Sequence, residues 1–201
     1  MRVLLLGANG GTGREILGSA LAAGGCVTAV VRSEDRLADV CHSNLNTYAG
    51  DVRDPSFLKQ LVPGHDAVIS TLGPRRPTKS ACAIYPESAL AVVEAMETCG
   101  VKRLLVTSTA LLFPSRRWLH RALRLIARHN VRYAERMEQI ILASSLDWTI
   151  TRVGFLNNSG SINYQLSADE GGPISRKAVA RFLLDEARAS NHVQQVLGLT
   201  A

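Results

Sequence analysis

The sequence predicts an α/β protein with a doubly wound, mostly parallel sheet of about seven strands and helices on both faces. Short apolar runs rich in branched side chains alternate along the chain with segments of helical periodicity. Such alternation indicates parallel strands joined by right-handed crossovers, and continuous apolar runs are typical of strands buried on both faces. No linker or repeat interrupts the pattern, so residues 1–201 are expected to form one domain.

Seven segments have the pattern of strands, and helical segments lie between them. The expected strands are residues 3–6, 27–31, 46–49, 67–71, 104–107, 149–151 and 193–197. The expected helices are residues 12–23, 34–40, 56–61, 85–99, 115–144 and 176–189. In such a sheet, ligands bind beyond the carboxyl ends of the strands, where the strand order reverses. The loops after the first, fourth and fifth strands are therefore expected to carry the chemistry.

A glycine-rich turn follows the first strand directly and opens the first helix. Glycines allow a tight turn and a close approach of the backbone to a diphosphate. The helix adds unpaired N–H groups and the positive end of its dipole. The turn therefore predicts a Rossmann-type dinucleotide site, whose first candidate residues are Gly7, Asn9, Gly10, Gly11, Thr12 and Gly13.

The end of the second strand bears on which cofactor binds. Domains that prefer NAD usually carry Asp or Glu there, about 20 residues after the turn, to bind the ribose 2′-hydroxyl. Here the strand ends in Arg32 and Ser33. A guanidinium pairs with a 2′-phosphate and the serine adds a hydrogen bond, so the sequence favours NADP(H) over NAD(H).

Together these residues resemble the atypical short-chain dehydrogenases/reductases, the NmrA-like NAD(P)-binding proteins, which include biliverdin-IXβ/flavin reductases and NADH-flavin reductases. The resemblance covers nearly the whole chain and is carried by the glycine turn and by residues 31–32, 50–54, 66–69, 72–73, 106–108, 146–150 and 174–180. It implies an adenine site at Asp51 and Val52. The other cofactor contacts that it implies are Leu72, Gly73 and Arg75 along the nucleotide, and Thr107 and Ser108 beside the nicotinamide.

The usual catalytic pair of short-chain dehydrogenases, Tyr-x-x-x-Lys, is absent. Its lysine lowers the tyrosine pKa, but here Met137 stands four residues after Tyr133. One interpretation is that hydride passes to a conjugated acceptor, such as a flavin, bilin or quinone, with Ser108 orienting substrate or nicotinamide and solvent supplying the proton. The other is that Tyr133 is the acid, tuned by Arg132 or Arg136. Ser108 and Tyr133 are thus the catalytic candidates.

The net charge of +6 comes from one segment, because residues 114–136 contain seven arginines and a single acid. The arginines at 117, 121, 124 and 128 are expected to share a helix face opposite an apolar stripe at 119, 123 and 126. The stripe would dock on the protein and leave a solvated basic face. Alternatively, the segment from Arg116 to Arg136 is a lid that attracts an anionic acceptor. Nucleic acid is disfavoured, because aromatics are scarce there and the remaining chain is neutral.

Other classes of site and location are disfavoured. No apolar run approaches the roughly 20 residues of a membrane span, so a cytoplasmic protein without a membrane partner is expected. The cysteines at 26, 41, 82 and 99 are widely spaced and the histidines are scattered, so no metal is expected. A monomer or a small homo-oligomer is expected.

The sequence favours an NADPH-dependent oxidoreductase that passes hydride to a conjugated small-molecule acceptor, with a substrate pocket formed by about residues 108–175. The alternative is a non-catalytic NADP(H)-binding sensor or regulator, as NmrA-like relatives can be. Isomerase or epimerase chemistry on a nucleotide sugar is less favoured, because the chain is short and the Tyr–Lys pair is missing.

Overall fold

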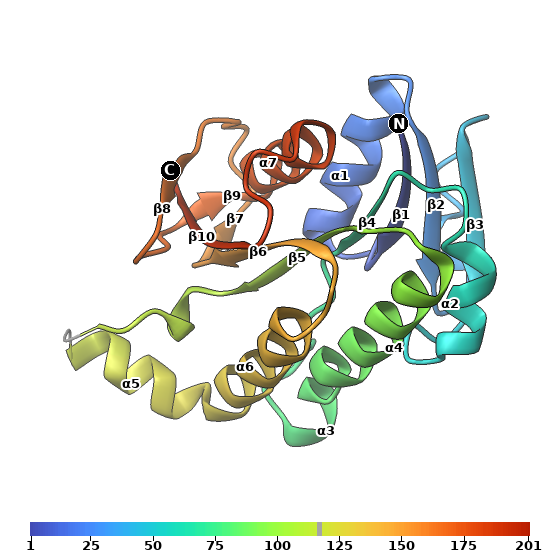
Figure 1. Ribbon diagram of the computed structural model, residues 1–201. Coiled ribbons are helices and arrows are strands. Elements are labelled where there is room, and N and C mark those ends of the chain that lie inside the picture. The colour runs from blue at the N-terminus through green and yellow to red at the C-terminus, as the bar shows by residue number, and fades with distance from the viewer. Residues whose placement is uncertain (116–117) are drawn as a thin grey trace.

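An eight-stranded sheet forms the centre of the protein in a computed structural model that describes residues 1–115 and 118–201 (Figure 1). Its strands are β1 (Arg2–Leu6), β2 (Cys26–Val31), β3 (Leu45–Ala49), β4 (Ala67–Ser70), β5 (Arg103–Thr109), β6 (Asp147–Val153), β8 (Gln165–Ser167) and β10 (Gln195–Thr200). The spatial order is β3-β2-β1-β4-β5-β6-β10-β8. Neighbouring strands are parallel except β10 and β8. A separate parallel pair is formed by β7 (Leu156–Asn157) and β9 (Ile174–Ser175).

Helices cover both faces of the sheet (Figure 1). They are α1 (Gly11–Ala22), α2 (Pro55–Leu61), α3 (Lys79–Cys82), α4 (Ile84–Cys99), α5 (Trp118–Ile126), α6 (Arg128–Leu142) and α7 (Arg176–Ala189), with short 3₁₀ turns η1 (Glu34–Leu37) and η2 (Ala110–Leu112). Apolar side chains of α1 and α7 pack on one face, and those of α2, α4 and α6 pack on the other. Along β1, Val3 and Leu5 join the first core while Leu4 and Leu6 join the second, as the two-residue period of a strand requires.

The doubly wound fold predicted from the sequence is confirmed, with differences at its far edge. The final strand is β10 rather than residues 193–197, because Gln194 has a φ of 55° and is still part of the preceding turn. The short strands β7, β8 and β9 were not predicted. They carry no apolar run, and β8 is largely exposed at the sheet edge. The four-residue helix α3 was also not predicted.

The predicted helix over residues 115–144 is wrong as a single element. The chain forms α5 and α6, and Ala127 between them has a φ of −91° and a ψ of 22°. Of the predicted apolar stripe, Leu123 is half-buried, whereas Leu119 and Ile126 are 55% and 76% exposed, so the stripe as a whole does not dock on the protein. Arg128 is the first residue of α6, so it does not share a helix face with Arg121 and Arg124 of α5 as predicted. The predicted positions Arg116 and Arg117 lie outside the described residues.

Candidate functional site

The residues predicted to bind a cofactor meet at one edge of the sheet. They lie at or directly after the carboxyl ends of the parallel strands β1, β2, β3, β4 and β5. The chain leaves β1 for β2 on one side and later places β4 on the other side, so the strand order reverses at β1. Ligands of doubly wound sheets bind beyond such a reversal. The fold therefore brings the separate candidates to the position where such a ligand would bind.

The glycine turn after β1 is shaped by close backbone contacts. Gly7 has a φ of +86°, a conformation that favours glycine, and a Cβ there would lie 2.9 Å from Thr71 Oγ1. A Cβ on Gly13 would lie 2.1 Å from the carbonyl oxygen of Gly7. The Gly10 N–H donates to that same carbonyl oxygen at 2.9 Å. The turn therefore requires glycine at positions 7 and 13 for steric reasons alone.

The amino end of α1 fits an anion. No side chain from the described part of the chain caps this end, and the first turn of the helix contains no acid. Gly10 and Gly11 are exposed there, whereas Thr12 is buried. Unpaired N–H groups and the positive end of the helix dipole therefore face outward at the position expected for a diphosphate.

Arg176, which was not among the predicted site residues, lies against this turn. A Cβ on Gly11 would lie 2.5 Å from Arg176 Nε, so the absence of a side chain at Gly11 makes room for the guanidinium. Arg176 Nη1 also donates to Asn158 Oδ1 at 2.6 Å. A cation beside the positive end of a helix is unfavourable unless an anion lies near both. No sequence pattern indicates this contact, because α7 and α1 are far apart in the chain.

A second arginine links the glycine turn to the segment after β2. Arg14 Nη2 donates to Asn9 Oδ1 at 3.1 Å and to the carbonyl oxygen of Arg36 at 2.8 Å. Its Nη1 pairs with Asp39 at 2.5 Å. Asn9, a predicted cofactor contact, is thus held from α1, and the pairing with Arg14 lowers the pKa of Asp39.

Arg32 and Ser33 lie where the prediction requires them, immediately after β2. Both are exposed. Among the described side chains, which do not include those of Glu34, Arg116 and Arg117, Arg32 has no hydrogen-bond or ion-pair partner that a phosphate would have to displace. The nearby cation Arg14, by contrast, is engaged with Asp39.

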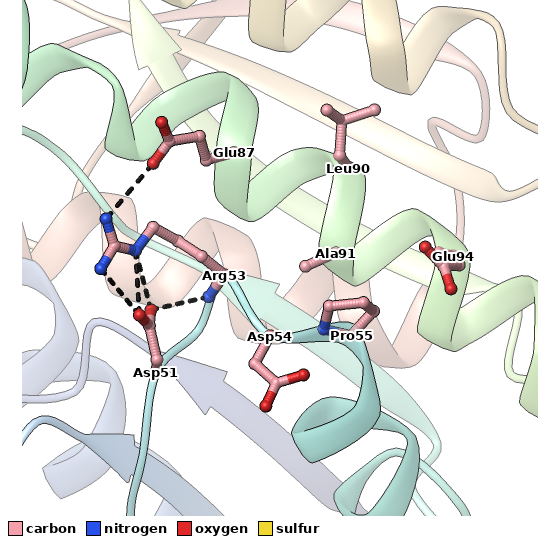
Figure 2. Close-up of a pocket in the computed structure, with 8 residues that line it drawn as sticks. All are labelled: Asp51, Arg53, Asp54, Pro55, Glu87, Leu90, Ala91 and Glu94. Carbon is pink, nitrogen blue, oxygen red and sulfur yellow. Dashed lines mark hydrogen bonds and ion pairs between the residues drawn. The ribbon is translucent and has the colours of Figure 1, made fainter.

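Asp51, the predicted adenine contact, is held by Arg53 (Figure 2). Arg53 Nη2 lies 2.7 Å from Asp51 Oδ2, and Arg53 Nε lies 2.9 Å from Oδ1. This hydrogen-bonded pairing holds the pKa of Asp51 below its usual value, so the carboxylate is charged at neutral pH. Arg53 Nη1 also reaches Glu87 on α4 at 3.4 Å. The neighbouring Val52 is half-buried and packs on the core.

A pocket of about 430 Å³ opens beside Asp51, between the start of α2 and α4 (Figure 2). Its apolar wall consists of Pro55, Leu90 and Ala91. Carboxylates surround this wall, from Asp51, Asp54, Glu87 and Glu94. The pocket lies at the predicted adenine end of the site and not in residues 108–175, where the substrate pocket was expected. That expectation stays a prediction.

The segment after β4 contributes Leu72 and Gly73. Leu72 is half-buried against the core, and Gly73 is exposed. A Cβ on Gly73 would lie 3.5 Å from the Tyr85 hydroxyl oxygen, an ordinary contact. Arg75 is exposed two residues further along the same loop. These three residues therefore lie beyond the carboxyl ends of the strands, on the same side as the glycine turn.

Ser108, at the carboxyl end of β5, is already engaged by the protein. It is 4% exposed, and its hydroxyl donates to Glu138 Oε1 at 2.5 Å. Arg152 on β6 binds the same carboxylate with Nε at 3.1 Å and Nη2 at 2.7 Å. The guanidinium of Arg152 lies 4.7 Å from the ring centroid of Phe113. Glu138 and this role of Arg152 were not predicted from the sequence, because the three polar residues come from three different elements.

The second catalytic candidate, Tyr133, lies on α6. It is half-buried and packs on the core between the sheet and the helices α2, α4 and α6. Thr107, the remaining nicotinamide candidate, is half-buried on β5 opposite Thr151.

Among the described residues, no group of three or more His, Cys, Asp or Glu side chains could hold a metal ion. Nor is any described helix both long and apolar enough to cross a membrane.

A doubly wound sheet with a glycine turn and an uncapped helix end at its topological reversal defines a dinucleotide-binding class of protein. The chain matches the NAD(P)H-binding family over residues 7–189 and belongs to that family. This assignment confirms the NAD(P)-binding family expected from the sequence.

Several solved structures share this fold. ChuY, an anaerobillin reductase from Escherichia coli O157:H7, has a TM-score of 0.81 and 24% identity, with 99% of this chain and 96% of that chain covered. A Rossmann-fold NAD(P)-binding family protein from Shigella flexneri has a TM-score of 0.79 and 24% identity, with coverages of 99% and 92%. A wide-type short-chain dehydrogenase/reductase from Veillonella parvula, in complex with NADP, has a TM-score of 0.75 and 20% identity, with coverages of 100% and 94%.

Proposed function

We propose that the protein is an NADPH-dependent reductase that transfers hydride to a conjugated acceptor of the flavin, bilin or quinone type. The observation that carries this proposal is the glycine turn with its open helix end, in a chain of the NAD(P)H-binding family. Similarity in fold to ChuY, which is described as an anaerobillin reductase, supports a bilin-type acceptor.

Arg32 is the proposed ligand of the 2′-phosphate. It is exposed after β2 and lacks a partner among the described side chains, which suits it to an added anion. Ser33 contributes a hydroxyl at the same place. Arg176 is proposed as a further contact for the diphosphate, because its guanidinium lies against the uncapped start of α1. On this proposal Arg32 selects NADP(H), whereas Arg176 acts on NADP(H) and NAD(H) alike.

Bound NADPH supplies the hydride, and the residues of the chain bind the cofactor and hold it in orientation. The proposed adenine contacts are Asp51 and Val52, and Leu72, Gly73 and Arg75 are proposed to follow the nucleotide. Thr107 is proposed beside the nicotinamide, where the bonds between Ser108, Glu138 and Arg152 keep the ends of β5 and β6 in place. A conjugated acceptor delocalises the charge that it gains, so solvent can supply the proton.

Ser108 therefore acts as a positioning residue in the state described here, because its hydroxyl donates to Glu138. The second mechanism, with Tyr133 as the acid, stays a separate hypothesis. Tyr133→Phe distinguishes the two. A loss of turnover of tenfold or more with unchanged NADPH affinity would favour the tyrosine, and unchanged turnover would favour solvent.

The proposal is tested by mixing the protein with NADPH and riboflavin, FMN, biliverdin or a quinone, and by following nicotinamide absorbance. Steady oxidation of NADPH with one acceptor class is expected. Tight NADPH binding without turnover on the whole panel would instead favour the alternative, a non-catalytic NADP(H)-binding sensor of the NmrA-like type. The absence of the Tyr–Lys pair is the observation that keeps this alternative open.

The cofactor preference has its own test in Arg32→Ala. Loss of one charge-assisted phosphate contact should weaken NADPH binding by about tenfold or more and leave NADH binding nearly unchanged. Calorimetric titration with both cofactors measures this. Arg2→Ala is the matched control, because Arg2 is an exposed arginine at the opposite, amino end of β1. Equal losses for NADPH and NADH would contradict the assignment of Arg32.

A further inference from the structure

Helix α5 exposes large apolar side chains to solvent. Trp118 is 79% exposed, Leu125 is 71% exposed and Ile126 is 76% exposed, and Leu119 is also more than half exposed. Positions seven residues apart lie two helical turns apart on the same side, so 118 with 125 and 119 with 126 define one face. Trp118, Leu119, Leu125 and Ile126 together form the α5 apolar face.

The polar side of α5 is turned toward the protein instead. His120 and Arg124 lie one turn apart, opposite the α5 apolar face, and both are half-buried. The Nδ1 atom of His120 is buried without a hydrogen-bond partner in the described part of the chain. The helix contacts α6 and η2 and lies at the periphery of the protein (Figure 1). This orientation is the reverse of the usual amphipathic helix on a globular domain.

The charge of the segment that contains the α5 apolar face is predominantly positive. Residues 118–136 contain five arginines and a single acid, Glu135. Arg121 is exposed on α5, and Arg128, Arg132 and Arg136 are exposed at four-residue intervals along α6. A partner that covers this region must therefore offer apolar material for the helix face and negative charge for the arginines.

We propose that α5 binds the surface of an anionic lipid bilayer, with the α5 apolar face at the acyl boundary and the arginines at the headgroups. With nine residues, α5 is suited to lie along the surface and is too short to cross it. A second copy of the chain fits less well, because face-to-face contact would bring the two sets of arginines together. Nucleic acid offers phosphates but gives no reason for an exposed apolar face. No membrane partner was expected from the sequence, because it has no apolar run long enough to span a bilayer. The contact proposed here lies along the bilayer surface and needs no such run.

Flotation of the full chain with vesicles tests the proposal. The protein should float with vesicles of phosphatidylcholine and phosphatidylglycerol in equal parts and stay behind with phosphatidylcholine alone. Added salt should weaken the binding, since it screens the headgroup charge. Trp118 fluorescence should shift to the blue, while Trp148, which is 6% exposed, should not respond. The shift should therefore be absent in Trp118→Phe.

The decisive variant is Leu125→Gln with Ile126→Gln, because both side chains are exposed and the fold should tolerate the change. It should bind anionic vesicles about tenfold more weakly or worse. Leu142→Gln, on an exposed leucine at the end of α6, is the matched control and should bind as the parent does. Circular dichroism verifies that both variants fold.

Three results would overturn the proposal. The first is no flotation with anionic vesicles, and the second is equal flotation with both vesicle types. The third is a concentration-dependent dimer, seen by sedimentation, that the Leu125→Gln, Ile126→Gln variant abolishes, which would assign the α5 apolar face to a second copy of the chain.

Discussion

At the scale of single residues, two glycines of the same helix stand in opposite environments. A Cβ on Gly13 would lie 2.1 Å from the Gly7 carbonyl oxygen, whereas a Cβ on Gly18 would have no atom within 4 Å. The first glycine is required by the turn that precedes α1, and the second only lowers the stability of the helix.

Replacement of each by alanine should therefore have opposite effects. Gly13→Ala should distort the turn and weaken NADPH and NADH binding by about tenfold or more. Gly18→Ala, the matched control, should raise the free energy of unfolding by about 0.5–1 kcal/mol and leave cofactor affinity unchanged. Calorimetric titration and urea unfolding measure the two effects. Unchanged affinity in Gly13→Ala would remove the turn from the cofactor site.

The residues of the site could be predicted from the sequence only where one local segment defines them. The glycine turn and Arg32 stand at fixed distances along one strand–helix–strand unit, so their spacing was sufficient. Arg176 and Glu138 could not be predicted in this way. The contact of Arg176 with Gly11 and the contact of Glu138 with Arg152 depend on tertiary packing, for which a single sequence has no periodic pattern.

At the scale of elements, Glu138 joins α6 to two strands. Its buried carboxylate accepts hydrogen bonds from Ser108 on β5 and from Arg152 on β6. Glu138 is 3% exposed, and the side chain of Arg152 is 18% exposed. Removal of one member of such a pair leaves the other charge without compensation in a poorly solvated place.

Glu138→Gln should therefore lower the free energy of unfolding by about 3 kcal/mol, measured by urea denaturation. Glu135→Gln, on an exposed acid one turn earlier in the same helix, should have little effect. The double variant Glu138→Gln, Arg152→Met should lose less than the sum of the single variants, since the two residues share one interaction. Additive losses would mean that the pair is not energetically coupled.

The presence and type of most helices and strands could be predicted from the sequence, and the failures have physical causes. Most parallel strands of the eight-stranded sheet are short apolar runs, and all seven were predicted, although β3 is largely exposed and β10 has other bounds than predicted. The strands β7, β8 and β9 are short and mostly polar, so they depend on pairing partners that the sequence does not reveal. The break at Ala127 was missed because alanine favours helix and neither Gly nor Pro is present to indicate an end.

At the scale of the whole molecule, the free energy of unfolding should depend on pH in the alkaline range because of the ionisation of Tyr85. This tyrosine is 7% exposed on α4, and burial raises its pKa to about 12. The unfolded chain ionises the phenol from about pH 10, its ordinary value. Between these values only the unfolded state gains from ionisation, so the free energy of unfolding should fall as pH rises from about 10 to 12.

The loss attributable to Tyr85 is about 2–3 kcal/mol over that interval. Tyr85→Phe should have a shallower fall between pH 10 and 12 in urea unfolding than the parent. Tyr48→Phe, on an exposed tyrosine of β3, controls for loss of a phenol elsewhere. Parallel pH profiles for Tyr85→Phe and the parent would contradict this attribution.

Arg176 has a consequence for kinetics. Its guanidinium lies against Gly11 at the start of α1 and also donates to Asn158, directly after β7. In the proposed reductase, a dinucleotide that engages this side chain would steady the polypeptide around Asn158 before an acceptor arrives. We therefore expect a compulsory order of addition, with NADPH first and NADP⁺ released last. Product inhibition by NADP⁺ should be competitive toward NADPH and not toward the acceptor, and Arg176→Gln should relax this order, while Lys177→Gln should keep it.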